Sequence, residues 1–143
     1  MTPRIIYLMK RAEIEITSRM TDDLEACGLT PIQYSLLYFI DINQGDLSSA
    51  QLSRRFSVTP QSMNELVQVL QGKKLLKKNT DPAHGRILRI SITRKGKQLL
   101  EESSHALDEL ESNLFKKFSG DDINTLRSLV GKMLETAAEA RLT

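Results

Sequence analysis

Residues 52–74 constrain the fold more than any other stretch of this sequence. They read LSRRFSVTPQSMNELVQVLQGKK, two short segments with apolar residues at helical spacing that meet at a tight turn, residues 57–59. Thr59 can cap the second segment, because its hydroxyl can accept a hydrogen bond from a free amide of the first turn. Pro60 fits the first helical position, where no amide donor is needed. The stretch therefore predicts a short helix, a tight turn and a capped second helix.

Both segments carry an apolar stripe that has to be buried. It contains Leu52 and Phe56 before the turn, and Met63, Leu66, Val67 and Leu70 after it. The opposite face of the second segment is polar and mostly uncharged, with Gln61, Ser62, Asn64, Glu65, Gln68 and Gln71. This is the layout of a helix-turn-helix. The alternative is an ordinary helical hairpin inside a core.

Length and composition limit the class of protein. The 143 residues are enough for one domain with a core, or for such a domain with a dimerisation extension. No apolar run approaches the roughly 18 residues of a membrane span, and residues 5–9 are too short a run for a signal-peptide core. We expect a cytoplasmic protein without membrane contact. The single cysteine, Cys27, excludes an intrachain disulfide and a cysteine-cluster metal site.

Charge is distributed unevenly along the chain. Residues 48–97 contain eleven basic and two acidic side chains, a net charge of +9. Since the whole chain carries +2, the remaining residues carry −7. A basic middle between acidic ends indicates a lobe that binds a polyanion.

Cap and proline signals place the helices before residue 52. A helix of about 25 residues is expected between Thr2-Pro3 and Gly28, and at 1.5 Å per residue it would be ~37 Å long. That length predicts that it extends to a partner chain. A second helix, expected to be buried, should begin at Thr30-Pro31 and run to about Ile42. Ser48 or Ser49 can cap the next one.

After residue 74 the periodicity changes. Residues 75–78 resemble a strand, residues 79–86 read as a loop with Pro82 and Gly85, and residues 87–92 alternate as in a half-buried strand. Thr93 can cap a long amphipathic helix, and a last helix should begin after Ser119. A helix-turn-helix followed by a hairpin with a basic tip is a winged helix.

Short motifs in a fixed order support a family assignment. They are GLTPIQY at 28–34, LSRRFSVTP at 52–60, Leu66-Val67 with Leu70, DPAHGR at 81–86 and ISITRKG at 90–96. In these motifs the chain resembles, over nearly its whole length, the MarR family of bacterial transcriptional regulators.

The resemblance implies a mainly α (α+β) fold in one domain, residues 1–143. A winged helix-turn-helix DNA-binding lobe would span about residues 30–95, with dimerisation helices at about 1–28 and 96–143. It also implies a homodimer on a pseudo-palindromic operator in double-stranded DNA, with a recognition helix in each major groove and a wing in each flanking minor groove. Such a protein is more often a repressor than an activator. A small effector, often an aromatic acid or phenol, would bind between lobe and dimer helices and release the operator.

Several positions depart from the family pattern. The family often has Thr-Arg where this chain has Asn64-Glu65, and Asp and Arg where it has Gln68-Val69. A usual glycine is Lys74, and the usual acidic and basic wing-tip residues are His84 and Gly85. We therefore do not expect the common operator of the family.

Candidate DNA contacts fall into three groups. Base edges would be read by neutral polar residues of the second segment, Gln61, Ser62, Asn64 and Gln68. Arg86 at the wing tip is the candidate for the minor groove, whose negative potential attracts arginine; the alternative is a brace with Asp81. Phosphate candidates are Arg54, Arg55, Lys73, Lys74, Lys77, Arg89 and Arg94. Any of these residues can instead be a merely solvated side chain.

Two other functions also have a basis in the sequence. Cys27 could sense peroxide, but it lies at an expected helix C-terminus, which disfavours a thiolate, so a structural role is favoured. An architectural DNA-binding protein without an effector is the other alternative. His84 and His105 lack the spacing of zinc ligands, so we expect no metal and no cofactor. No nucleophile-base pair or phosphate loop is visible, and we expect no enzymatic activity.

Overall fold

The computed structural model describes residues 1–45, 47–80, 83 and 88–142. The described elements, in chain order, are α1 (Ile5–Leu24), the 3₁₀ turn η1 (Glu25–Cys27), α2 (Pro31–Ile42), α3 (Ser49–Arg55), α4 (Pro60–Gly72), β1 (Leu76–Thr80), β2 (Leu88–Ile92), α5 (Arg94–Leu114) and α6 (Gly120–Leu142). The predicted fold class is confirmed: helices dominate, and β1 and β2 form a small antiparallel sheet. Within the described residues, no helix is both long enough and apolar enough to span a membrane.

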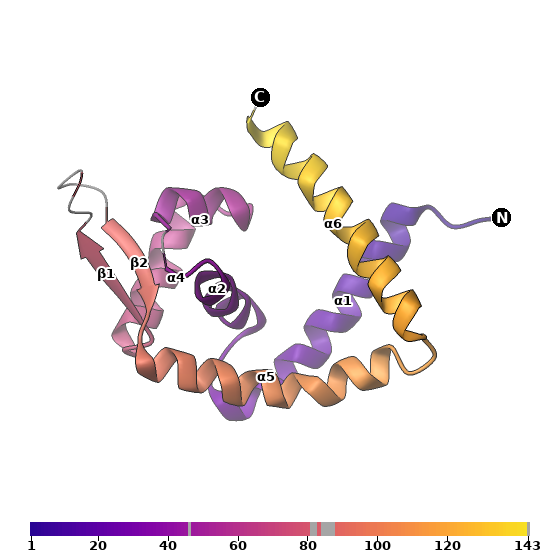
Figure 1. Cartoon of the computed structure of the whole chain (residues 1–143), viewed down its shortest axis with the longest axis horizontal. Helices are drawn as coiled ribbons and strands as arrows, with labels where there is room; N and C mark the ends of the chain where they lie inside the picture. The colour runs from indigo at the N-terminus through magenta and orange to yellow at the C-terminus, as the bar shows by residue number, and fades with distance from the viewer. Residues whose placement is uncertain (46, 81–82, 84–87, 143) are drawn as a thin grey trace.

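Helices α2, α3 and α4 and the hairpin form one lobe, at the end of the molecule away from the N-terminus (Figure 1). Its core contains the predicted stripe of the helix-turn-helix, with Leu52, Met63, Val67 and Leu70 fully buried. These side chains pack with Leu36, Leu37 and Ile40 of α2 and with Leu75, Leu76, Ile90 and Leu100. Burying one such side chain contributes roughly 1.5–3 kcal/mol, so the stripe determines which face of α4 remains outside.

Side-chain caps begin α2, α3 and α4 where the sequence predicted them. Thr30 and Ser48 each form a capping box, with Gln33 and Gln51 as the reciprocal partners. Thr59 accepts from the amide of Ser62 at the start of α4. Each cap satisfies an amide that would otherwise lack a partner, which is worth about 1 kcal/mol.

The hairpin is joined to the helices by a bridge that the sequence analysis missed. β1 and β2 pair in antiparallel register, with Leu76 opposite Ile92 and Lys78 opposite Ile90. The amide of Ile90 also donates to the carbonyl of Leu47, 2.8 Å away, so Leu47 adds a one-residue bridge on the other side of β2. β1 extends through Thr80, although residues 79 and 80 were predicted to lie in the loop.

The first helix is shorter than predicted. α1 covers 20 residues, because the chain is still extended at Arg4 and tightens into η1 after Leu24. Gly28 ends this segment in the left-handed conformation, at φ 71°. The sequence analysis predicted the end of the helix at this glycine. α5 leads from the lobe past α1 to the start of α6, and α6 runs back from the far end of α5 (Figure 1).

Lys74 follows α4 in a conformation that favours glycine. Its φ is 63°, in the left-handed region where a Cβ costs roughly 1–2 kcal/mol. We therefore expect Lys74→Gly to stabilise the protein by about 1 kcal/mol in urea unfolding, although it removes an ammonium group. Lys74→Ala is the matched control, because it removes the same charge and keeps the Cβ. Equal stability of the two variants would contradict the strain at this position.

Candidate nucleic-acid interface

The polar face of α4 is exposed, as a recognition helix requires. The candidates Gln61, Ser62, Asn64 and Gln68 all lie on this face. Because Met63, Val67 and Leu70 are buried against the core, the helix cannot rotate about its axis without exposing them. The four side chains are therefore presented together on a rigid helix.

Two of these candidates also make contacts within the protein. The hydroxyl of Ser49, in the first turn of α3, donates to Oδ1 of Asn64 at 2.6 Å. The hydroxyl of Thr59 donates to Oγ of Ser62 at 3.0 Å. The Ser49 contact directs the Asn64 amide, whose NH₂ group remains a donor. Ser49 was missed by the sequence analysis; two adjacent serines, of which one suffices as the cap, were the available signal.

The hairpin presents a polar face next to α4. Because strand residues alternate in direction and paired residues share a face, Lys77, Asn79, Arg89 and Ser91 lie together, opposite the buried Leu76 and Ile90. The amide of Asn79 donates to the Ser91 hydroxyl at 3.1 Å. Arg86 and its alternative partner Asp81 lie outside the described residues.

Two of the phosphate candidates make contacts within the protein. The ammonium group of Lys73 donates to the carbonyl of Gly28 at 2.9 Å and so ties the end of α4 to the turn before α2. The guanidinium group of Arg55 lies 5.2 Å from the ring centroid of Phe39, a cation–π distance. Arg54, Lys74, Lys77 and Arg94 are exposed, at the end of α3, after α4, on β1 and at the start of α5 respectively.

A pocket of about 520 Å³ lies between α1, α2 and α5. Tyr34 and Tyr38 of α2 line it, with ring centroids 6.0 Å apart. The Tyr34 hydroxyl is 3.0 Å from the hydroxyl of Ser104. Burial raises the pKa of Tyr34 and outweighs the hydrogen bond with Ser104, so the phenol is neutral at pH 7. The family resemblance implied an effector site between lobe and dimer helices without naming its residues; two tyrosines one turn apart in α2 were the available signal.

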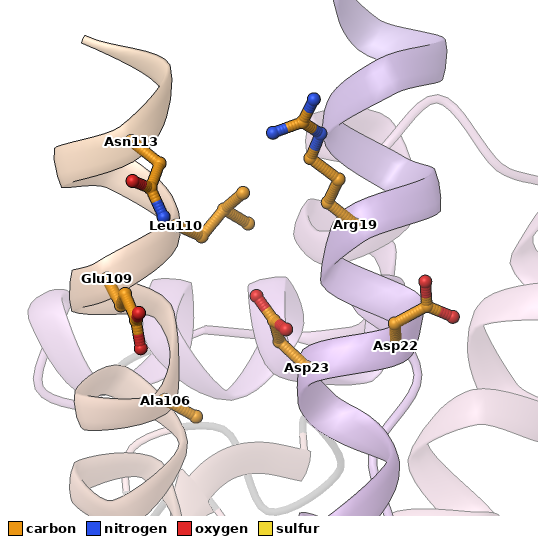
Figure 2. Close-up of a pocket in the computed structure, with 7 residues that line it drawn as sticks. All are labelled: Arg19, Asp22, Asp23, Ala106, Glu109, Leu110 and Asn113. Carbon is orange, nitrogen blue, oxygen red and sulfur yellow. The ribbon is translucent and has the colours of Figure 1, made fainter. Parts of the chain in front are cut away.

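A second hollow, of about 360 Å³, separates α1 from α5 and is polar (Figure 2). Arg19, Asp22 and Asp23 line it from α1, and Glu109, Leu110 and Asn113 are on the α5 side. Three carboxylates and one guanidinium group make it acidic. Among the described residues, no group of three or more histidine, cysteine, aspartate or glutamate side chains could hold a metal ion, and this hollow is no exception.

Cys27 is the last residue of η1 and is half-buried. It follows a short helical turn and does not lie at a helix N-terminus, where thiolates are stabilised. Its structural role stays a prediction.

Comparisons with known proteins agree with this geometry. Residues 28–87 match the model of the MarR family. The regulator YhbI of Bacillus subtilis is 25% identical over 136 residues, which cover 95% of this chain and 84% of that protein. The transcriptional repressor Rv2887 of Mycobacterium tuberculosis is 24% identical over 127 residues, covering 89% and 91% respectively.

A solved structure shares the fold. CouR from Rhodococcus jostii RHA1, bound to p-coumaroyl-CoA, superposes with a TM-score of 0.81 over 92% of this chain and 91% of its own, at 18% identity. CouR has also been solved on a 23-mer DNA duplex. The family match covers the helix-turn-helix and β1, and the fold match extends over the long helices. Over residues 28–87 the chain therefore matches the MarR family of transcriptional regulators, and over nearly its whole length it has the fold of solved members of that family.

Proposed function

We propose that the protein is a homodimeric repressor that binds a pseudo-palindromic operator and releases it when a small molecule enters the pocket between α1, α2 and α5. The observation that carries the proposal is α4, a capped helix with an exposed neutral polar face beside a basic hairpin. Neutral amides can distinguish bases, while flanking cations bind phosphate. Chromosomal DNA as the target would place the protein in the cytoplasm.

We propose that the chain acts as a single domain. The lobe at about residues 30–95 would bind DNA, and the helices at about residues 1–28 and 96–143 would hold the dimer. Gln61, Ser62, Asn64 and Gln68 would meet bases, and Arg86 would enter the minor groove. The exposed cations Arg54, Lys74, Lys77 and Arg94 would bind phosphate. Lys73 and Arg55 would contribute charge while they also support the fold. Arg89 would contribute charge from the polar face of the hairpin.

DNA captured by the protein from its own genome tests the proposal. Sequencing should reveal a few enriched sites, each with two half-sites about 10 bp apart or a multiple of that spacing. A Gln61→Ala/Gln68→Ala double variant should capture the same DNA less selectively, because it keeps every cation. Recovery of all genomic fragments in equal amounts would contradict a sequence-specific regulator and favour the architectural alternative.

Apolar side chains on α6 support the proposed dimer. Leu129 and Leu134 are 56% and 54% exposed in the single chain, and Leu126 and Met133 are exposed near them. A soluble monomer rarely leaves such a contiguous surface uncovered. α1 adds further exposed apolar residues, Ile5, Ile6, Tyr7, Leu8 and Ile14. A second copy of the chain would cover both helices.

Leu129→Glu is expected to break this dimer, because it would bury an unpaired charge in the interface. Ser128→Glu, on the polar side of the same helix, introduces the same charge and should leave the dimer intact. Light scattering at micromolar concentration measures the result. A monomeric wild-type protein, or two variants that behave alike, would rule out α6 as the dimer contact.

A further inference from the structure

The lining of the pocket between α1, α2 and α5 combines apolar walls with carboxylates. Ile16 and Met20 of α1 and Leu107 and Leu114 of α5 provide aliphatic surface. The stacked rings of Tyr34 and Tyr38 form the wall on the α2 side. The volume of about 520 Å³ falls within the range that drug-sized ligands occupy. The walls therefore suit a ligand with an aromatic or bulky apolar body.

The charged groups of the lining are all negative. Asp108 and Glu111, one turn apart on α5, both line the pocket, and no lysine or arginine lines it in the described part of the chain. The imidazole of His105 lies 3.4 Å from Asp108, and both side chains are exposed. Arg127 lies in the adjoining hollow between α5 and α6, which Asp108 and Glu111 also line, and donates to Asn124. The residues that line the pocket all lie outside residues 48–97, in the part of the chain whose net charge is −7.

The environment of Tyr34 reports the same negative potential. Burial is the main cause that raises the pKa of Tyr34, and the hydrogen bond with Ser104 opposes it. The charges of Tyr38, Glu111 and Asp108 raise this pKa further. The phenol thus stays neutral, and its ring lines the pocket beside that of Tyr38. Aromatic faces attract organic cations, most strongly where water is excluded. An aromatic carboxylate in the same position would instead face two like charges.

We propose that the effector of this protein is a lipophilic organic cation, held by Asp108 and Glu111 against the tyrosine wall. This deepens the proposed function and rests on it, because it names the ligand class for the same pocket. The family resemblance implied an aromatic acid or phenol. This proposal replaces that expectation with a positively charged ligand.

Two probes of nearly equal shape and opposite charge test the inference. Tetraphenylphosphonium carries +1 and tetraphenylborate −1, and isothermal titration calorimetry on the full-length protein measures each without DNA. The cation should bind at least about tenfold more tightly than the anion. An Asp108→Asn/Glu111→Gln double variant should bind the cation about fivefold to thirtyfold more weakly, because it loses both carboxylates with little change in shape.

The matched control is Glu101→Gln/Glu102→Gln. It removes two carboxylates from α5 outside the pocket lining, so it should bind the cation like the wild type. Comparable binding of both probes, or an equal loss in both double variants, would overturn the inference. Thermal melts confirm that each variant is folded.

Operator release separates this inference from the proposed function. Tetraphenylphosphonium should weaken operator binding by the wild type and have less effect on the Asp108→Asn/Glu111→Gln variant. If the protein selects an operator but does not bind the cation, the inference about the ligand fails and the proposed function as a regulator is retained. If the cation binds with the stated discrimination but no operator is selected, the proposed function fails and the assignment of the pocket's ligand class stands.

Discussion

Affinity for DNA is expected to fall by ~10³–10⁵ between about 50 and 200 mM salt, if a dimer neutralises about 6–10 phosphates. The reason is the +9 charge of residues 48–97, which would release condensed counterions from the duplex. Lys77→Ala should weaken binding to operator and random DNA alike and reduce the salt slope by about 1. Lys77 suits this test because it is exposed on the outer face of the hairpin. Lys73 does not, since its ammonium group ties α4 to Gly28.

Substitutions of the neutral residues of α4 should change the preference for operator DNA and not the salt dependence. Gln68→Ala or Asn64→Ala should lower the preference for operator over random DNA by about 1–3 kcal/mol and leave the salt slope unchanged. Ser49→Ala is informative beside Asn64→Ala, because it frees the amide without removing it. Titrations at several salt concentrations on both DNAs measure all of these effects. If both alanine variants kept full preference, specificity would have to come from Gln61, Ser62, the wing or DNA shape.

The helix starts could be predicted because their signals are local. Thr30, Thr59 and Thr93 accept hydrogen bonds from amides three residues later, so each cap is complete within one turn of sequence. The stripe of α4 was equally readable, since its period directly encodes the buried face. Fold class and the helix-turn-helix follow from these two kinds of signal.

The contacts that were missed join residues far apart in sequence. Ser49 reaches Asn64 across 15 positions, and Lys73 reaches Gly28 across 45. Leu47 is a single residue, too short for a periodic pattern, and it pairs only because β2 passes beside it. The length of α1 was overestimated because Thr2-Pro3 resembles a cap and a first helical residue, whereas the helix begins at Ile5 without a side-chain cap.

The pocket lining illustrates the same limit. Tyr34 and Ser104 are 70 positions apart and meet only when α5 packs across α2. The family resemblance indicated a cavity between lobe and dimer helices, but its charge depends on which carboxylates of α5 face it. That selection follows from the packing of the whole helix and cannot be read from composition.

Gly96→Ala is expected to destabilise the protein by about 2–3 kcal/mol, the largest loss of stability expected from a single added methyl group here. A Cβ at this position would lie 2.3 Å from the carbonyl oxygen of Leu75 and 2.7 Å from Cγ1 of Ile92. The Leu75 carbonyl cannot retreat freely, because it accepts from the amide and hydroxyl of Thr93 at 3.0 and 3.1 Å. Relief would require α5 to move away from the lobe.

Gly72→Ala is the matched control, because Gly72 ends α4 and a Cβ there would meet nothing within 4 Å. That substitution should be neutral or stabilise by about 0.5–1 kcal/mol, since it reduces the entropy of the unfolded chain. Urea unfolding of both variants measures the difference. If Gly96→Ala unfolded at the wild-type midpoint, the junction between β1 and α5 would be looser than these distances require. α5 could then shift against the hairpin at little cost, and a ligand on α5 would have no rigid contact through which to reposition the DNA-binding lobe.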